Sequence, residues 1–161
     1  MELTSIDYAR LIQYAAQKQH MVLLNKTQIN KILFYVYGVY LAENQLPLFM
    51  DDTPKAWTYG PVFPRPNKSV DINEVIKSFP ADKVKANKKA LDLVVKVVDR
   101  MYDKSAMSLT QWSHVENSPW YNTVYQKDRD GNIIKQRPWN TRIEDSLIKD
   151  YFSKPENRIF G

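Results

Sequence analysis

The feature that most constrains this chain is an apolar segment of eleven residues, 32–42, which contains neither a charged nor an amide side chain. A helix that is apolar on nearly all sides must be packed on nearly all sides. Crossing a bilayer takes about 20 apolar residues, so the segment is too short to span one. We therefore predict a buried central helix that has Thr27 as its cap and continues to about Glu43.

Apolar periodicity and capping residues predict further helices before and after the central one. The expected segments are residues 5–17, residues 71–78, residues 87–102, and helices beginning at Ser108, Ser118 and Thr141. Thr4 or Ser5 is the expected cap of the first helix. Ser118 followed by Pro119 is a typical helix start, because proline needs no N–H partner in the first turn. Capping-box patterns mark the starts at Ser108 and Thr141.

Five prolines between residues 45 and 69 argue against a helix in that stretch. They are Pro47, Pro54, Pro61, Pro64 and Pro66. Residues 56–59 alternate as a short strand does, residues 60–61 predict a turn, and residues 62–63 are expected to be extended. Proline has no N–H to donate to a neighbouring strand, so a proline-rich segment cannot pair fully on both sides. We therefore expect an edge strand or an ordered loop here rather than a central strand.

The elements together predict an α+β fold that is predominantly helical. A length of 161 residues is typical of one domain, and no repeat or linker interrupts it. We expect a single compact domain, residues 1–161, of about six helices. It should carry a small β element around residues 56–63 and a hairpin near residues 125–136, turning at Asp130-Gly131.

The composition excludes several kinds of active site. The absence of cysteine rules out a disulfide scaffold, a thiolate zinc site and a cysteine nucleophile. Four glycines and the lack of a glycine-rich phosphate loop argue against a nucleotide site. His114 and Glu116 are the one pair suited to acid and base catalysis, but we favour a structural role for them beside Trp112 and Trp120. We expect no enzyme, cofactor or metal.

The net charge of +5 permits binding to nucleic acid or to an acidic protein. The basic residues are scattered, and no helix-turn-helix pattern is evident. The first residues do not form a basic start followed by an apolar run, as a signal peptide would. We therefore expect a cytoplasmic protein that does not associate with a membrane.

Three stretches, taken in order, resemble the Panacea domain, a SocA-like antitoxin family once described as phage-associated. They read KILFYVYGVYL followed by LPLF, then AWTYGPVFP, then SLTQWSHVE followed by SPW. The resemblance covers about residues 25–125. The positions that carry it as a framework are Lys31, Leu33, Tyr35, Leu41, His114, Glu116, Pro119 and Trp120.

The resemblance implies a non-catalytic antitoxin-type protein that binds and neutralises a cognate toxin protein. One way of acting within the family is as an adaptor that brings the toxin to a cellular protease. The alternative is a phage-derived nucleic-acid-binding or regulatory module, for which the net positive charge and the aromatic content argue.

We place the partner-binding surface on the proline-rich segment, because it presents aromatic, aliphatic and cationic groups together. The residues are Trp57, Tyr59, Gly60, Pro61, Val62 and Arg65. The competing interpretation is that the tryptophans fill the core around the central helix. The hairpin around Asp130-Gly131 is the next candidate surface.

Overall fold

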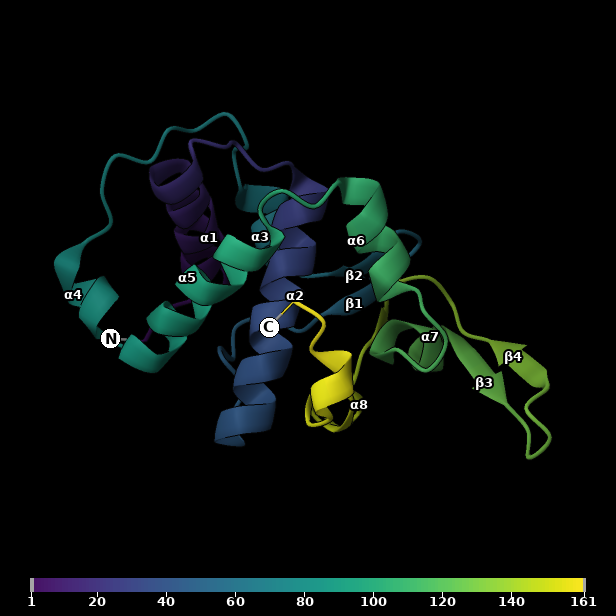
Figure 1. Ribbon diagram of the computed structural model, residues 1–161. Coiled ribbons are helices and arrows are strands. Elements are labelled where there is room, and N and C mark those ends of the chain that lie inside the picture. Colours follow the sequence, from purple (N-terminus) through teal and green to yellow (C-terminus); the bar gives the residue numbers. More distant parts are fainter. Residues whose placement is uncertain (1, 161) are drawn as a thin grey trace.

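The computed structural model describes residues 2–160, which form eight α-helices, one 3-10 helix and five short strands (Figure 1). The helices are α1 (Ser5–His20), α2 (Lys26–Asn44), α3 (Pro64–Ser69), α4 (Ala81–Lys85), α5 (Lys88–Met101), α6 (Ala106–Ser113), α7 (Pro119–Val124), α8 (Asp145–Phe152) and the 3-10 turn Pro155–Asn157. The strands are β1 (Lys55–Trp57), β2 (Gly60–Val62), β3 (Tyr125–Lys127), β4 (Ile133–Gln136) and β5 (Thr141–Arg142). The predicted fold class, α+β and predominantly helical, is confirmed.

Helix α2 is the centre of the fold, as its apolar character predicted. It packs against α1, α5, α6, α8 and β2 (Figure 1). The predicted cap Thr27 is wrong, because the helix begins two residues earlier. The side chain of Asn25 accepts the Gln28 N–H at 2.8 Å, and the side chain of Gln28 accepts the Asn25 N–H at 2.9 Å. This reciprocal pair satisfies two N–H groups that a helix start leaves free.

Helix α8 packs directly on α2, and a glycine makes their approach possible. A Cβ placed on Gly38 would overlap the ring of Phe152, which is fully buried. That ring also makes edge contacts with Phe34 and Tyr35, at centroid distances of 5.8 and 5.5 Å. The segment that begins at residue 145 therefore closes the core over the middle of α2.

The small sheet has the order β2-β1-β5, and both of its pairings are antiparallel. Strand β1 is thus central, which corrects the prediction that this segment lies at an edge. Proline is accommodated because Pro61 lies in β2, which is an edge strand. The turn is also displaced from the predicted residues 60–61. It lies at residues 58–59, and Gly60 already pairs with Trp57, with a φ of +113°.

The prediction that residues 45–69 contain no helix is wrong. The proline-rich stretch contains helix α3, with Pro64 and Pro66 in its first turn, where their missing N–H groups need no partner.

The predicted helix at residues 71–78 is also wrong, because this segment is not helical. Hydrogen bonds from side chains of α1 explain the difference. The amides of Gln13 and Gln17 donate to the carbonyls of Asp71 and Glu74, each at 2.9 Å. These bonds hold the segment against α1, with a turn at residues 72–73 and no helix.

Of the other predicted helix starts, some are correct and some are displaced. Thr4 caps α1 with Asp7 in a capping box, and Ser118 caps α7, as predicted. The β3–β4 hairpin is present around Gly131. Helix α6, however, is capped by Ser105 rather than Ser108. Residues 141–142 form strand β5 on β1, so α8 begins only at residue 145. Among residues 2–160, no helix has the length and apolar content that a bilayer crossing needs.

Candidate protein-binding site

A groove of about 230 Å³ lies between strand β1 and the base of the β3–β4 hairpin. We call it the tryptophan groove, because three tryptophans line it. Its lining residues are Ala56, Trp57, Thr58, Trp120, Val124, Tyr125, Gln136, Arg137, Pro138 and Trp139. They come from β1 and the turn after it, from α7 and β3, and from the end of β4 and the segment that follows it.

Hydrogen bonds from two indole groups hold the walls of the tryptophan groove in place. Trp120 Nε1 donates to the carbonyl of Trp57 at 2.7 Å, and Trp57 Nε1 donates to Asn140 Oδ1 at 2.8 Å. The ring of Trp57 stacks on that of Trp139, with centroids 5.3 Å apart. Trp139 is 63% exposed. Two indoles are therefore fixed by the fold, and a third is presented to the surroundings.

His114 fastens the β1–β2 turn to helix α6. Its Nε2 lies 2.9 Å from the carbonyl oxygen of Thr58, and its Nδ1 lies 2.6 Å from that of Thr110. The imidazole packs on Trp120, with ring centroids 3.9 Å apart. These contacts support the floor of the tryptophan groove.

Glu116 has a different partner from His114. Its carboxylate accepts a hydrogen bond from Lys127 Nζ of strand β3 at 2.6 Å, and this contact lowers the pKa of Glu116. The two residues considered as an acid and base pair therefore face different neighbours. Within residues 2–160, no three His, Asp or Glu side chains converge as metal ligands would.

A buried lysine lies beneath the β1–β2 turn. Lys31 of α2 is 1% exposed, and its Nζ donates to the carbonyl of Pro61 at 3.1 Å. Burial lowers the pKa of Lys31 to about 8. A Cβ at Gly60 would lie 2.8 Å from Lys31 Cε and 2.5 Å from Ser113 Oγ. Glycine therefore lets the first residue of β2 lie directly on these two side chains.

The structure divides the predicted partner-binding residues into three groups. Gly60, Pro61 and Val62 are buried, because β2 packs on α2 and α6. Trp57 is half-buried and belongs to the tryptophan groove. Tyr59, 73% exposed, lies before β2, and Arg65 lies beyond the other end of that strand, in α3. One continuous surface made of all six residues, as the sequence suggested, does not form.

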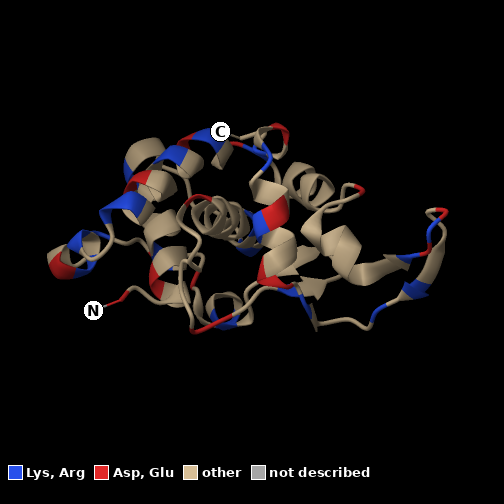
Figure 2. Ribbon diagram, turned by 90° about the horizontal axis from the view of Figure 1, so that it is seen from below, with Lys and Arg blue, Asp and Glu red and all other residues tan. Residues whose placement is uncertain are grey.

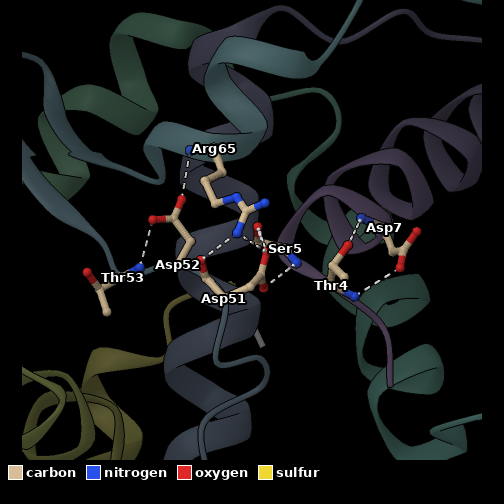
Figure 3. A network of polar contacts seen from close by, with 7 residues as sticks. All are labelled: Thr4, Ser5, Asp7, Asp51, Asp52, Thr53 and Arg65. Carbon is tan, nitrogen blue, oxygen red and sulfur yellow. Dashed lines mark hydrogen bonds and ion pairs between the residues drawn. The ribbon is translucent and has the colours of Figure 1, made fainter. Parts of the chain in front are cut away.

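Arg65 takes part in a polar network that joins α3 to the start of α1 (Figure 3). Its backbone N–H donates to Asp52 Oδ2 at 2.8 Å, and its guanidinium donates to the carbonyl of Asp51 at 3.2 Å. The Asp51 carboxylate accepts both the N–H and the hydroxyl of Ser5, at 2.9 and 2.8 Å. Arg65 therefore has a structural role besides any contact with a partner.

The framework residues of α2 point into the core. Leu33 and Tyr35 are fully buried, and Leu41 nearly so. The Tyr35 hydroxyl accepts the Phe160 N–H at 3.2 Å. Pro119 and Trp120 are buried in α7.

Trp139 and Arg137 also line the groove, although neither belongs to the predicted partner-binding residues. The available signal was a tryptophan in the otherwise polar run RPWN, at residues 137–140. A lone large apolar residue in such a run points to a contact.

A family model described as "Antitoxin SocA-like, Panacea domain" matches residues 29–121. The match covers more than half of the chain and agrees with the resemblance seen in the sequence. It includes most of α2, the strands β1 and β2, and α6, whereas the β3–β4 hairpin and Trp139 follow it. Comparison with curated proteins and with solved structures found no match.

Proposed function

This chain belongs to the SocA-like antitoxin family that is defined by the Panacea domain, and from that membership we propose that it binds and neutralises a cognate toxin protein without catalysing a reaction. The observation that carries the proposal is the tryptophan groove with its exposed Trp139. Tryptophan, tyrosine and arginine are the residue types enriched at the centres of protein interfaces.

The size of the groove favours a protein partner over a metabolite. Pockets for small ligands usually measure about 300–1,000 Å³ and enclose most of the ligand. A groove of about 230 Å³ is smaller and accommodates one or two side chains of a partner. Its tryptophan walls are held by hydrogen bonds before binding, so little ordering entropy is lost when a partner docks.

The contacts of the two candidate catalytic residues support a non-catalytic role. Both ring nitrogens of His114 lie within 3 Å of backbone carbonyl oxygens, and Glu116 is bound to Lys127. Neither side chain has the free, mutually oriented geometry that a general acid and base require.

We predict that this chain suppresses the toxicity of the protein encoded by the neighbouring gene. Cells that express that protein alone should stop growing, and co-expression of this chain should restore growth. The two proteins should also purify together, because neutralisation acts through binding. Persistent toxicity together with separate purification would refute the proposal.

The control variant for this experiment is His114→Asn. Asparagine can replace the contact of Nδ1 but not that of the more distant Nε2, and it removes general-base capacity. Because the variant loses contacts beneath the tryptophan groove, its affinity can fall, but wherever the folded variant still binds the toxin it should still restore growth. Loss of neutralisation in a well-folded variant that still binds the toxin would indicate catalysis instead.

The same strains separate direct blocking from an adaptor role. If the chain only covers the toxin, the lifetime of the toxin after synthesis stops should be unchanged or longer. If the chain delivers the toxin to a cellular protease, that lifetime should become shorter and recover in a protease-deficient strain.

A further inference from the structure

The β3–β4 hairpin extends away from the helical body as a protruding arm (Figure 1, Figure 2). Its sheet contains two strands among the described residues, so each strand has an unpaired outer edge. Strand β4 is exposed along its whole length. An unpaired, exposed edge offers its free N–H and C=O groups to another extended segment.

The register shows which backbone group of β4 faces outward. The Arg137 N–H donates inward to the carbonyl of Val124 at 2.8 Å. In an antiparallel pair, the N–H groups of successive residues point to opposite sides. The Gln136 N–H therefore points away from β3, towards the free edge.

The hairpin region carries most of the net positive charge of the chain. Residues 125–142 contain five basic and two acidic residues, a net charge of +3 out of +5 (Figure 2). Lys127 and Arg142 each lie within 4 Å of a glutamate carboxylate. Among residues 2–160, the side chains of Arg129, Lys135 and Arg137 have no such ion pair.

Apolar side chains accompany these charges. Ile133 and Ile134 are 54% and 60% exposed. Residues 136–139 lead directly from β4 into the tryptophan groove. A segment of another protein that ran alongside β4 would therefore reach the groove.

We propose that the free edge of β4 receives an extended, acidic segment of the partner protein, which adds a strand to the hairpin and places an apolar side chain in the tryptophan groove. This inference rests on the proposed function, with the toxin as the partner. Backbone hydrogen bonds would supply affinity, and the groove and the unpaired cations would select the sequence. Added to β4, four residues of the partner extend over roughly 13 Å.

The same observations favour a protein over a nucleic acid. A nucleic acid strand cannot form the ladder of backbone bonds that a strand edge offers. Asp128 and Asp130 lie at the tip of the hairpin, where they would repel phosphates. Exposed isoleucines fit an apolar side chain better than a phosphate backbone.

The test of strand addition is Gln136→Pro, with Gln136→Ala as its matched control. Proline removes the outward N–H and is tolerated on an edge strand, and Lys135 already has the extended backbone that a following proline requires. We expect the Kd of Gln136→Pro for the toxin to be roughly 10-fold above that of Gln136→Ala, which loses the same side chain from the groove but keeps the outward N–H. Equal affinities for the two folded variants would overturn strand addition.

Charge reversal provides a second test that does not alter the backbone. Lys135→Glu with Arg137→Glu should weaken toxin binding by about 10-fold or more at low salt and flatten its salt dependence. Lys85→Glu with Lys88→Glu, which reverses two exposed charges on the other side of α2, should change binding by less than about 2-fold. Equal effects of the two double substitutions would overturn the inference that the bound segment is acidic.

The two proposals fail in distinguishable ways. If the native chain neutralises the toxin but neither hairpin test changes affinity, only the strand-addition inference is wrong. If the native chain fails to neutralise, both are wrong. Binding of a 20-nucleotide single strand that is tighter than toxin binding, and is lost on the hairpin charge reversal, would also overturn the inference.

Discussion

Phe152→Ala is expected to lower the free energy of unfolding by about 3–5 kcal/mol, the usual cost of removing a fully buried phenylalanine ring. The ring fills the space above Gly38 and packs against Phe34 and Tyr35. Truncation would leave a cavity between α2 and α8. Denaturant unfolding with linear extrapolation measures the loss.

The control is Tyr151→Ala, which removes a half-buried ring from the same helix and should cost less. Gly38→Ala gives an independent measure of the same contact, because its Cβ overlaps the Phe152 ring; we expect a loss of about 1–3 kcal/mol. Combining Gly38→Ala with Phe152→Leu should cost less than the two single losses together, since the smaller side chain makes room. Strict additivity would show that the two residues do not touch.

Lys31→Met is expected to stabilise the protein by about 2 kcal/mol at pH 7. Burial lowers the pKa of Lys31 from the ordinary 10.5 to about 8. The folded state thus holds the charged form at a cost of roughly 3 kcal/mol below pH 8. Methionine removes that cost and loses one hydrogen bond to the Pro61 carbonyl, worth about 1 kcal/mol.

The sign of the pH dependence follows from the depressed pKa of a cationic group. Between pH 8 and 10.5 the unfolded chain binds more protons at Lys31 than the folded chain does, so Lys31 makes stability rise with pH. The advantage of Lys31→Met should therefore shrink across this window.

The measurement is the difference in unfolding free energy between the variant and the native chain at pH 7, 8, 9 and 10. The control is Lys85→Met at an exposed lysine, which should leave stability nearly unchanged throughout. A stability difference between Lys31→Met and the native chain that stays constant or grows with pH would contradict a buried Lys31 charge that lowers stability.

The parts of the fold that the sequence predicted well depend on local patterns. The apolar content of residues 32–42 predicts a central helix because no other environment suits it. Thr4, Ser118 and Asp130-Gly131 act through bonds within a few residues, so their capping and turn roles can be predicted. The capping patterns at Ser108 and Thr141 predicted wrong helix starts, because other hydrogen bonds form there instead. Ser105 caps α6, and β5 pairs with β1.

The candidate site was only partly predictable because it is assembled from distant segments. Trp57 was predicted, but its partners Asn140 and Trp139 lie more than 80 positions away along the chain. The burial of Gly60 depends on Lys31 and Ser113, which only the tertiary fold brings beneath it. Local propensity carries no information about such approaches.

Isothermal titration of the toxin into native chain and into Trp139→Ala tests capture by the tryptophan groove most directly. Because Trp139 is 63% exposed, its loss should leave Tm nearly unchanged. As a central interface residue it should raise the Kd by about 30-fold, the effect of losing roughly 2 kcal/mol. Met107→Ala, at an exposed position of α6 that does not line the groove, should bind as the native chain does. An unchanged Kd for Trp139→Ala would contradict toxin capture by this groove.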